Sequence, residues 1–150
     1  MSEHRATIEW TRASEDFEAN TYSRDHLWRF EGGTETPASA APDYLGNKER
    51  VDPESSFVAS LSSCHMLTFL FLCARRRFVV DRYADEAVGF LEKNAEGKMA
   101  VTRVELRPAV EFSGEKRPSD EELAELHERA HRDCFIANSV TTRVEILPLP

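Results

Sequence analysis

Two cysteines that lie far apart in the chain carry its most reactive side chains. Cys64 lies in the stretch SSFVASLSSCHMLTFLFLCARRR, where small polar residues precede it and His65 follows it. Cys134 lies in HERAHRDCFIANS, three residues after His131. Three uses of these side chains are open at this point: packing as buried cysteines, binding a metal ion, or acting together as a dithiol.

The third cysteine, Cys73, is expected to be ordinary core. It follows Cys64 by nine residues in a predicted helix, and at about 100° per residue the two thiols point in opposite directions. They cannot share a site on one helix. Cys73 stands between Leu72 and Ala74, and a free buried cysteine usually packs as a small hydrophobic side chain.

A metal site is the weaker of the two reactive alternatives. Cys64, His65, His131 and Cys134 formally supply the Cys₂His₂ ligand set of zinc. Adjacent helical side chains diverge by about 100°, so Cys64 and His65 are poorly placed to bind one ion. No metal and no other cofactor is therefore expected.

A dithiol pair is the stronger alternative. In it, a Cys64 thiolate attacks an electrophile, and Cys134 resolves the product as a disulfide. A cysteine in the middle of a helix gains little from the helix dipole, so a nearby cation has to stabilise the thiolate. Arg24, in the segment YSRDH, is the candidate, with Arg29 in reserve, and Glu54 could hold that arginine through a bidentate ion pair.

The position of Glu54 suggests that two copies of the chain build the site. Glu54 precedes Cys64 by ten residues, which is about 15 Å along a helix. Glu54 must either fold back from before the helix or come from a second subunit. An interface between two copies is the simpler arrangement.

The segment that carries Cys64 is predicted to be a long central helix. Asp52, Pro53 and Glu54 form a typical helix start, with an N-cap acid, a proline at the first helical position and a carboxylate in the first turn. The pattern favours a helix to Arg77. Because residues 66–73 are apolar nearly all round, we expect this helix to be covered on every side.

The remaining elements predict an α+β fold with a mainly antiparallel sheet covered on one side by helices. Ser119 and Glu122 form a capping box for a second helix that carries Leu126, His127 and Cys134 on its inward face. NAEG at Asn94–Gly97 is a hairpin turn, and TPASAAPDYLGNKER is predicted to be a surface loop. Strands are predicted over 5–11, one or two within 20–33, 78–92, 104–112 and 139–147.

Composition limits the class of protein. The 150 residues fit one domain, residues 1–150, and the net charge of −8 disfavours binding to nucleic-acid phosphates. The N-terminus MSEHRATIEW lacks the pattern of a signal peptide, and the apolar run Met66–Ala74 is far shorter than the ~20 residues that span a membrane. Three cysteines in such a chain suggest reduced thiols and a cytoplasmic location, with no membrane partner.

The stretch VDPESSFVASLSSCHMLTFLFLCA, followed by LHERAHRDCFIANSV, resembles the OsmC/Ohr family of thiol peroxidases, over roughly residues 21–148. The resemblance implies an intertwined α+β homodimer with two active sites at its interface. It places Cys64 at the peroxide-attacking position, Cys134 at the resolving position and Glu54 at the carboxylate that holds the catalytic arginine, here Arg24. The implied substrate is an organic hydroperoxide, and the implied reductant is a dithiol such as a lipoyl-protein.

Two other functions stay open. The first is a non-catalytic protein that holds a small apolar ligand on the same dimeric scaffold, and the second is a Cys–His hydrolase that uses Cys64 with His131. The large apolar side chains near Cys64 could surround a ligand, although core packing is the expected role of Phe57, Leu61, Phe69 and Phe71. His65, His127 and His131 are expected to be hydrogen-bonded core histidines rather than catalytic ones.

Overall fold

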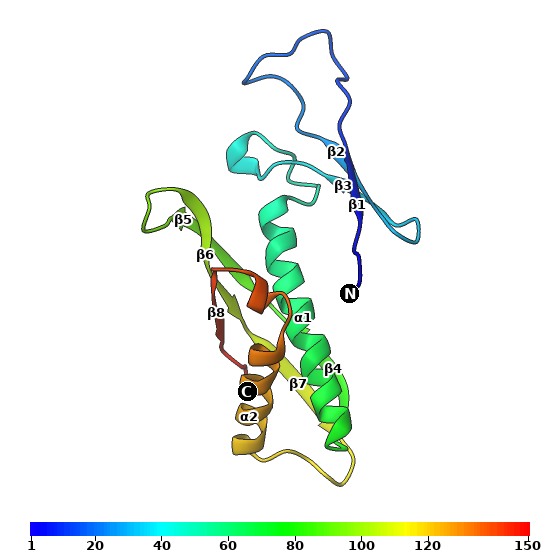
Figure 1. Cartoon of the computed structure of the whole chain (residues 1–150), viewed down its shortest axis with the longest axis vertical. Coiled ribbons are helices and arrows are strands. Elements are labelled where there is room, and N and C mark those ends of the chain that lie inside the picture. The colour runs from blue at the N-terminus through cyan, green and yellow to red at the C-terminus, as the bar shows by residue number, and fades with distance from the viewer. The chain divides into compact units, whose positions relative to one another are not determined.

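The computed structural model describes all residues, 1–150, and divides into two compact units, Met1–Ser56 and Phe57–Pro150 (Figure 1). The first unit contains three strands and a short 3-10 helix: β1 (Ala6–Glu9), β2 (His26–Phe30), β3 (Glu35–Ala38) and η1 (Pro42–Tyr44). Helix α1 (Pro53–Arg75) begins in the first unit and continues through the second. The second unit then adds β4 (Val79–Asp85), β5 (Val88–Lys93), β6 (Met99–Leu106), β7 (Pro108–Ser113), α2 (Asp120–Asp133), η2 (Ala137–Ser139) and β8 (Arg143–Ile146).

The first unit is an antiparallel sheet in the order β1-β2-β3. The predicted first strand is confirmed. The start of the predicted surface loop, however, forms β3: Gly32 and Gly33 reverse the chain, and Phe30 N–H donates to the Thr34 carbonyl at 2.9 Å. Pro37 is accommodated because β3 is an edge strand, where a missing N–H costs little.

The loop after β3 folds tightly against its own backbone. A Cβ atom on Gly46 would collide with the backbone carbonyl of Ala40, so this close approach requires glycine. The neighbouring Ser39 is fully buried, and its hydroxyl accepts a hydrogen bond from Asn47 N–H at 3.1 Å. These contacts fix the loop that leads into α1.

Helix α1 begins as its sequence predicts. The Asp52 carboxylate accepts hydrogen bonds from both the backbone N–H and the hydroxyl of Ser55, each at 2.8 Å, and Pro53 occupies the first helical position. The helix ends at Arg75, two residues before the predicted end. Arg77 adopts a left-handed backbone with φ of 63°, which allows Phe78 N–H to close the helix on the Cys73 carbonyl at 3.0 Å.

The prediction that α1 is covered on every side is wrong for the single chain. One face is buried, and it carries Leu61, His65, Phe69, Leu72 and Cys73. On the other face Leu67 and Phe71 are 61% and 60% exposed. By length and composition alone α1 could also cross a membrane, but its inner face packs into the protein core.

The second unit contains two small sheets, one of two strands and one of three. β4 pairs with β7 and β5 pairs with β6, both antiparallel, while β8 joins β6 in parallel. The predicted NAEG turn connects β5 and β6, with Gly97 at φ of 78°. The single strand predicted over 104–112 is in fact two strands, because the chain breaks at Arg107, whose N–H donates to the Asp85 carboxylate at 2.6 Å.

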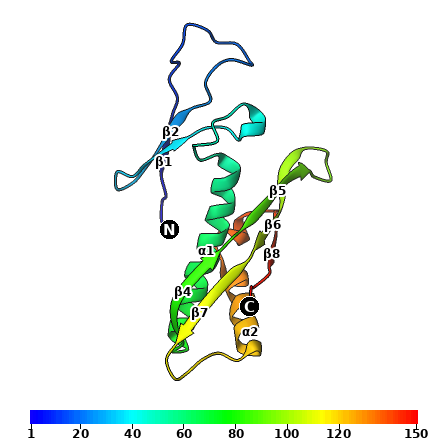
Figure 2. The same cartoon turned by 180° about the vertical axis from the view of Figure 1, so that it is seen from behind.

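Both helices lie on the same side of the β4–β7 pair (Figure 2). Phe69, Leu72 and Cys73 of α1 meet Leu126 and Ala130 of α2 in one core cluster. A second cluster joins Leu61 of α1 to β6 and β8. The predicted α+β class is confirmed.

Helix α2 has the predicted capping box: the Ser119 hydroxyl accepts from Glu122 N–H, and the Glu122 carboxylate accepts from Ser119 N–H. Cys134 is the C-cap residue of this helix. The predicted last strand is shorter than expected, because η2 takes its first residues and β8 covers only Arg143–Ile146.

Candidate functional site

The two thiols singled out in the sequence meet in the second unit. Cys64 lies half-buried in the middle of α1, and Cys134 lies at the C-terminal end of α2 with only 1% of its surface exposed. The two thiols lie near enough for Cys64 to raise the pKa of Cys134. Neither cysteine is in a disulfide in this structure.

The surroundings of Cys134 keep it protonated at neutral pH. Burial, together with the neighbouring Cys64 thiol, raises the pKa of Cys134 to about 11. The backbone N–H of Ala137 opposes this shift by donating to Cys134 Sγ at 3.4 Å, and Ile136 N–H acts in the same direction. The Cys134 S–H is therefore available as a donor to Cys64.

Cys64 is the accessible member of the pair. Ser63 beside it is exposed, and Ser60 one turn earlier is also exposed. Thr68 one turn later donates its hydroxyl to the Cys64 carbonyl at 3.0 Å, which turns this side chain back onto the helix. A small molecule can thus reach Cys64 from solvent, whereas Cys134 lies beneath the surface.

Cys73 has the expected core position. It is 1% exposed and belongs to the cluster formed by α1 and α2. Burial raises the pKa of its thiol to about 11, with a small opposing effect from Arg76.

The histidines form a buried pair that sequence analysis did not predict. His65 Nε2 and His127 Nδ1 lie 3.1 Å apart, and their rings are nearly parallel. His127 also stacks on Phe69. The other ring nitrogen of each histidine is buried without a protein partner, as is the hydroxyl of Tyr83, so the expectation of fully hydrogen-bonded core histidines is only half correct.

The formal zinc ligand set is not assembled. No group of three or more His, Cys, Asp or Glu side chains is arranged to hold a metal ion. His131 is only partly buried, and its backbone carbonyl accepts from Cys134 N–H at 3.3 Å.

Ser62 and Asp85 form a contact near Cys64 that the sequence did not reveal. The Ser62 hydroxyl donates to Asp85 Oδ2 at 2.5 Å, while Asp85 Oδ1 accepts from Arg107 N–H. One carboxylate thus joins the middle of α1 to the end of β4 and to the β6–β7 corner. No periodicity in the sequence could indicate a contact between residues 23 positions apart.

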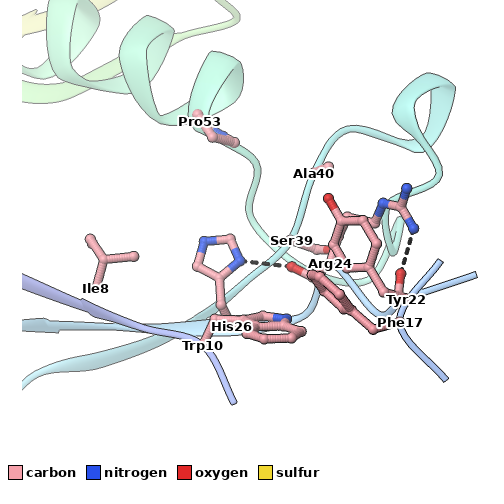
Figure 3. Close-up of a pocket in the computed structure, with 9 residues that line it drawn as sticks. All are labelled: Ile8, Trp10, Phe17, Tyr22, Arg24, His26, Ser39, Ala40 and Pro53. Carbon is pink, nitrogen blue, oxygen red and sulfur yellow. Dashed lines mark hydrogen bonds between the residues drawn. The ribbon is translucent and has the colours of Figure 1, made fainter. Parts of the chain in front are cut away.

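In the first unit, Arg24 lines a largely apolar cavity of about 410 Å³ (Figure 3). Its guanidinium donates to the carbonyls of Tyr22 and Ala19 and lies 3.8 Å from the centre of the Tyr22 ring. The other residues that line the cavity are Ile8, Trp10, Phe17, Tyr22, His26, Ser39, Ala40 and Pro53.

The loop that carries Arg24 is held by hydrogen bonds from aromatic residues. His26 Nε2 accepts from the Trp28 indole at 2.8 Å, so His26 Nδ1 carries the proton and donates to the Arg24 carbonyl at 2.8 Å (Figure 3). Trp10 donates its indole N–H to the Ser23 carbonyl at 2.7 Å. These bonds fix the backbone on both sides of Arg24.

The other two charged residues proposed from the sequence have different surroundings. Glu54 lies in the first turn of α1, where its side chain contacts Asp52. Arg29 pairs with Glu35 at 2.6 Å and with Glu9 at 2.9 Å across the sheet, so its charge is already matched. The association of Arg24 and Glu54 with Cys64 stays a prediction.

The structure defines an α+β protein with two helices that each bring one cysteine to the candidate site, and comparison with known proteins agrees with this fold. The OsmC-like protein family model matches residues 46–147. The chain belongs to the OsmC-like family.

Solved structures extend the match over nearly the whole chain. An OsmC-like protein of unknown function from Vibrio cholerae is 50% identical, with a TM-score of 0.97, covering 99% of this chain and 100% of that one. An organic hydroperoxide resistance protein OsmC from Legionella pneumophila is 14% identical with a TM-score of 0.71, covering 99% and 96%. The organic hydroperoxide resistance protein OhrB of Bacillus subtilis is 15% identical with a TM-score of 0.67, covering 99% and 98%. A search of curated proteins found no match.

Proposed function

We propose that this protein is a cysteine-based peroxidase that reduces organic hydroperoxides. The observation that carries the proposal is the closeness of a partly buried Cys64 to a fully buried Cys134. Membership of the OsmC-like family supports it, as do structural relatives named organic hydroperoxide resistance proteins.

The first step is attack of the Cys64 thiolate on the outer oxygen of the peroxide. The O–O bond breaks, the departing alkoxide takes a proton and leaves as an alcohol, and Cys64 becomes a sulfenic acid. Cys134 then attacks the Cys64 sulfur, expels water and forms a Cys64–Cys134 disulfide. The proximity of the two thiols in the reduced protein favours this second step.

An arginine is needed to stabilise the Cys64 thiolate and the charge that develops on the peroxide oxygen. We assign this role to Arg24, with Glu54 holding the guanidinium. Because Glu54 precedes Cys64 by ten residues on α1, about 15 Å along the axis, the proposal brings Arg24 and Glu54 from the second subunit of a homodimer. The apolar cavity beside Arg24 would then receive the organic part of the peroxide.

A dithiol such as a lipoyl-protein completes the cycle by reducing the disulfide. We include a cytoplasmic location in the proposal, because a cycle that returns both cysteines to thiols needs a reducing compartment.

The test is to treat the reduced protein with one equivalent of cumene hydroperoxide and to map its cysteines by mass spectrometry. A Cys64–Cys134 linkage is expected, with Cys73 unchanged. Cys134→Ser should stop at a sulfenic acid on Cys64, while the matched control Cys73→Ser should behave like the unmodified protein. Cys64 that remains a free thiol after exposure to the peroxide would rule out the peroxidase.

The second candidate is a non-catalytic protein that binds a small apolar ligand on the same scaffold. The aromatic lining of the cavity in the first unit favours it. It predicts a hydrophobic compound that copurifies with the protein and binds equally well to Cys64→Ser, together with no peroxide consumption.

A further inference from the structure

The two sulfur atoms differ sharply in their access to solvent. Cys134 is 1% exposed and is enclosed by the end of α2 and the turn into η2, whereas Cys64 is only half-buried. This difference bears on how a disulfide between them would be reopened, a step that rests on the proposed function.

Thiol–disulfide exchange requires the incoming sulfur to approach in line with the bond that breaks. An attack on Cys134 would have to come from the side opposite Cys64. Cys134 is 1% exposed, and backbone already lies against its sulfur: the N–H of Ala137 is 3.4 Å from Cys134 Sγ, and Ile136 N–H also donates to it. Cys64 is partly open to solvent, so an incoming thiol meets less enclosure there than at Cys134.

We propose that the reducing thiol attacks only Cys64, and that Cys134 is always the leaving group. A bond forms between the reductant sulfur and Cys64 Sγ, the Cys64–Cys134 bond breaks, and Cys134 leaves with the electron pair. It then takes a proton. The second thiol of the dithiol reductant next attacks the reductant sulfur that is bound to Cys64. This step breaks the mixed disulfide, releases the Cys64 thiolate and leaves the reductant oxidised as an internal disulfide.

The backbone around Cys134 is suited to this role. Burial disfavours a negative charge on its sulfur, which by itself would make Cys134 a poor leaving group. The N–H groups of Ala137 and Ile136 offset part of that cost, because they are fixed donors to the departing sulfur. Their geometry exists before the bond breaks, so no rearrangement is needed to supply them.

The test starts from a disulfide made with diamide, a thiol oxidant, so that it does not depend on the peroxidase reaction. After diamide is removed, the oxidised protein is mixed with excess 2-mercaptoethanol, quenched with acid after times from milliseconds to seconds, blocked with N-ethylmaleimide and digested with trypsin. Cys64 and Cys134 fall on different tryptic peptides, 51–75 and 133–143. The Cys73→Ala variant removes the second cysteine from the Cys64 peptide.

The expected result is a 2-mercaptoethanol adduct on Cys64, in at least about tenfold excess over any adduct on Cys134. Cys134→Ser, which cannot form the disulfide, should acquire no adduct. An adduct on Cys134, or loss of the disulfide without an adduct on Cys64 at any time point, would overturn the inference. If diamide gives no Cys64–Cys134 disulfide at all, the resolving step of the proposed function fails instead, and the two failures are distinct.

Discussion

His65 Nε2 and His127 Nδ1 lie 3.1 Å apart inside the second unit, where α1 and α2 meet. Burial lowers the pKa of both histidines, to about 3 for His65, where the neighbouring His127 and His131 add to the effect, and to about 4 for His127. Both rings are therefore neutral at pH 7, and one of the two facing nitrogens donates its N–H to the other.

This pair predicts that the protein loses stability in mild acid. Below the ordinary histidine pKa near 6.5 the unfolded chain takes up protons that the folded protein does not, until the pH falls through the folded pKa values. The free energy of unfolding should thus fall between pH 6.5 and pH 4, by about 1.4 kcal/mol per pH unit for each histidine. Urea unfolding at several pH values measures it.

The control is the double variant His65→Leu, His127→Leu, whose stability should vary less with pH over this range than that of the unmodified protein. Equal pH dependence in the two proteins would mean that the pair does not titrate as we infer.

The three cysteines should differ in reactivity toward iodoacetamide in the folded, reduced protein. The thiolate is the reactive form, and burial raises the pKa of both Cys73 and Cys134 to about 11. Cys64 should be alkylated at least about tenfold faster than the other two at pH 7.5. Peptide mapping over time measures the rates, and protein unfolded in urea should lose the difference. Fast labelling of Cys73 would contradict its core position.

The exposed apolar face of α1 should mediate dimer formation. Leu67 and Phe71 lie one turn apart on that face. Replacing both by glutamate places two charges in the proposed interface, and light scattering should report a dimer for the unmodified protein and a monomer for the variant. Leu149→Glu, at another exposed apolar residue, is the control and should remain dimeric. A monomeric unmodified protein would refute both the interface and the two-subunit site.

Asp85 should be important for stability, because it accepts hydrogen bonds from Ser62 and from Arg107 N–H. Asp85→Ala leaves both donors without their partner and should lower the free energy of unfolding by about 2–3 kcal/mol, whereas Ser62→Ala should cost about 1 kcal/mol. Denaturant titration of the two variants measures the difference. If Asp85→Ala lowers the free energy of unfolding no more than Ser62→Ala does, the Arg107 contact contributes little to stability.

Local patterns predicted both helix starts and the hairpin turn, whereas the single strand predicted over 78–92 is two strands, β4 and β5. The capping acid Asp52, the Ser119–Glu122 box and the turn at Asn94–Gly97 each act through neighbours within four residues, so the sequence is enough to recognise them. The division of residues 104–112 into two strands depended instead on Asp85, a distant carboxylate that binds the chain at Arg107.

The candidate site was predictable in part. Helical spacing separated Cys73 from Cys64 correctly, because the angle between two positions on one helix is fixed. The stacking of His65 on His127 could not be foreseen, because it depends on how two helices pack. The exposure of Leu67 and Phe71 could not be predicted either. An apolar pattern does not show whether the surface that covers a helix belongs to the same chain or to another.

Cys134 lies at the last turn of α2 and Cys64 at the midpoint of α1, so a covalent link between them would staple two helices across a long stretch of chain. Closing a loop of that length removes unfolded-state entropy worth about 4 kcal/mol. The disulfide-bonded protein would then resist thermal unfolding and proteolysis better than the reduced protein. Thermal melting would thus report the fraction of the protein that carries the disulfide and has not yet been reduced.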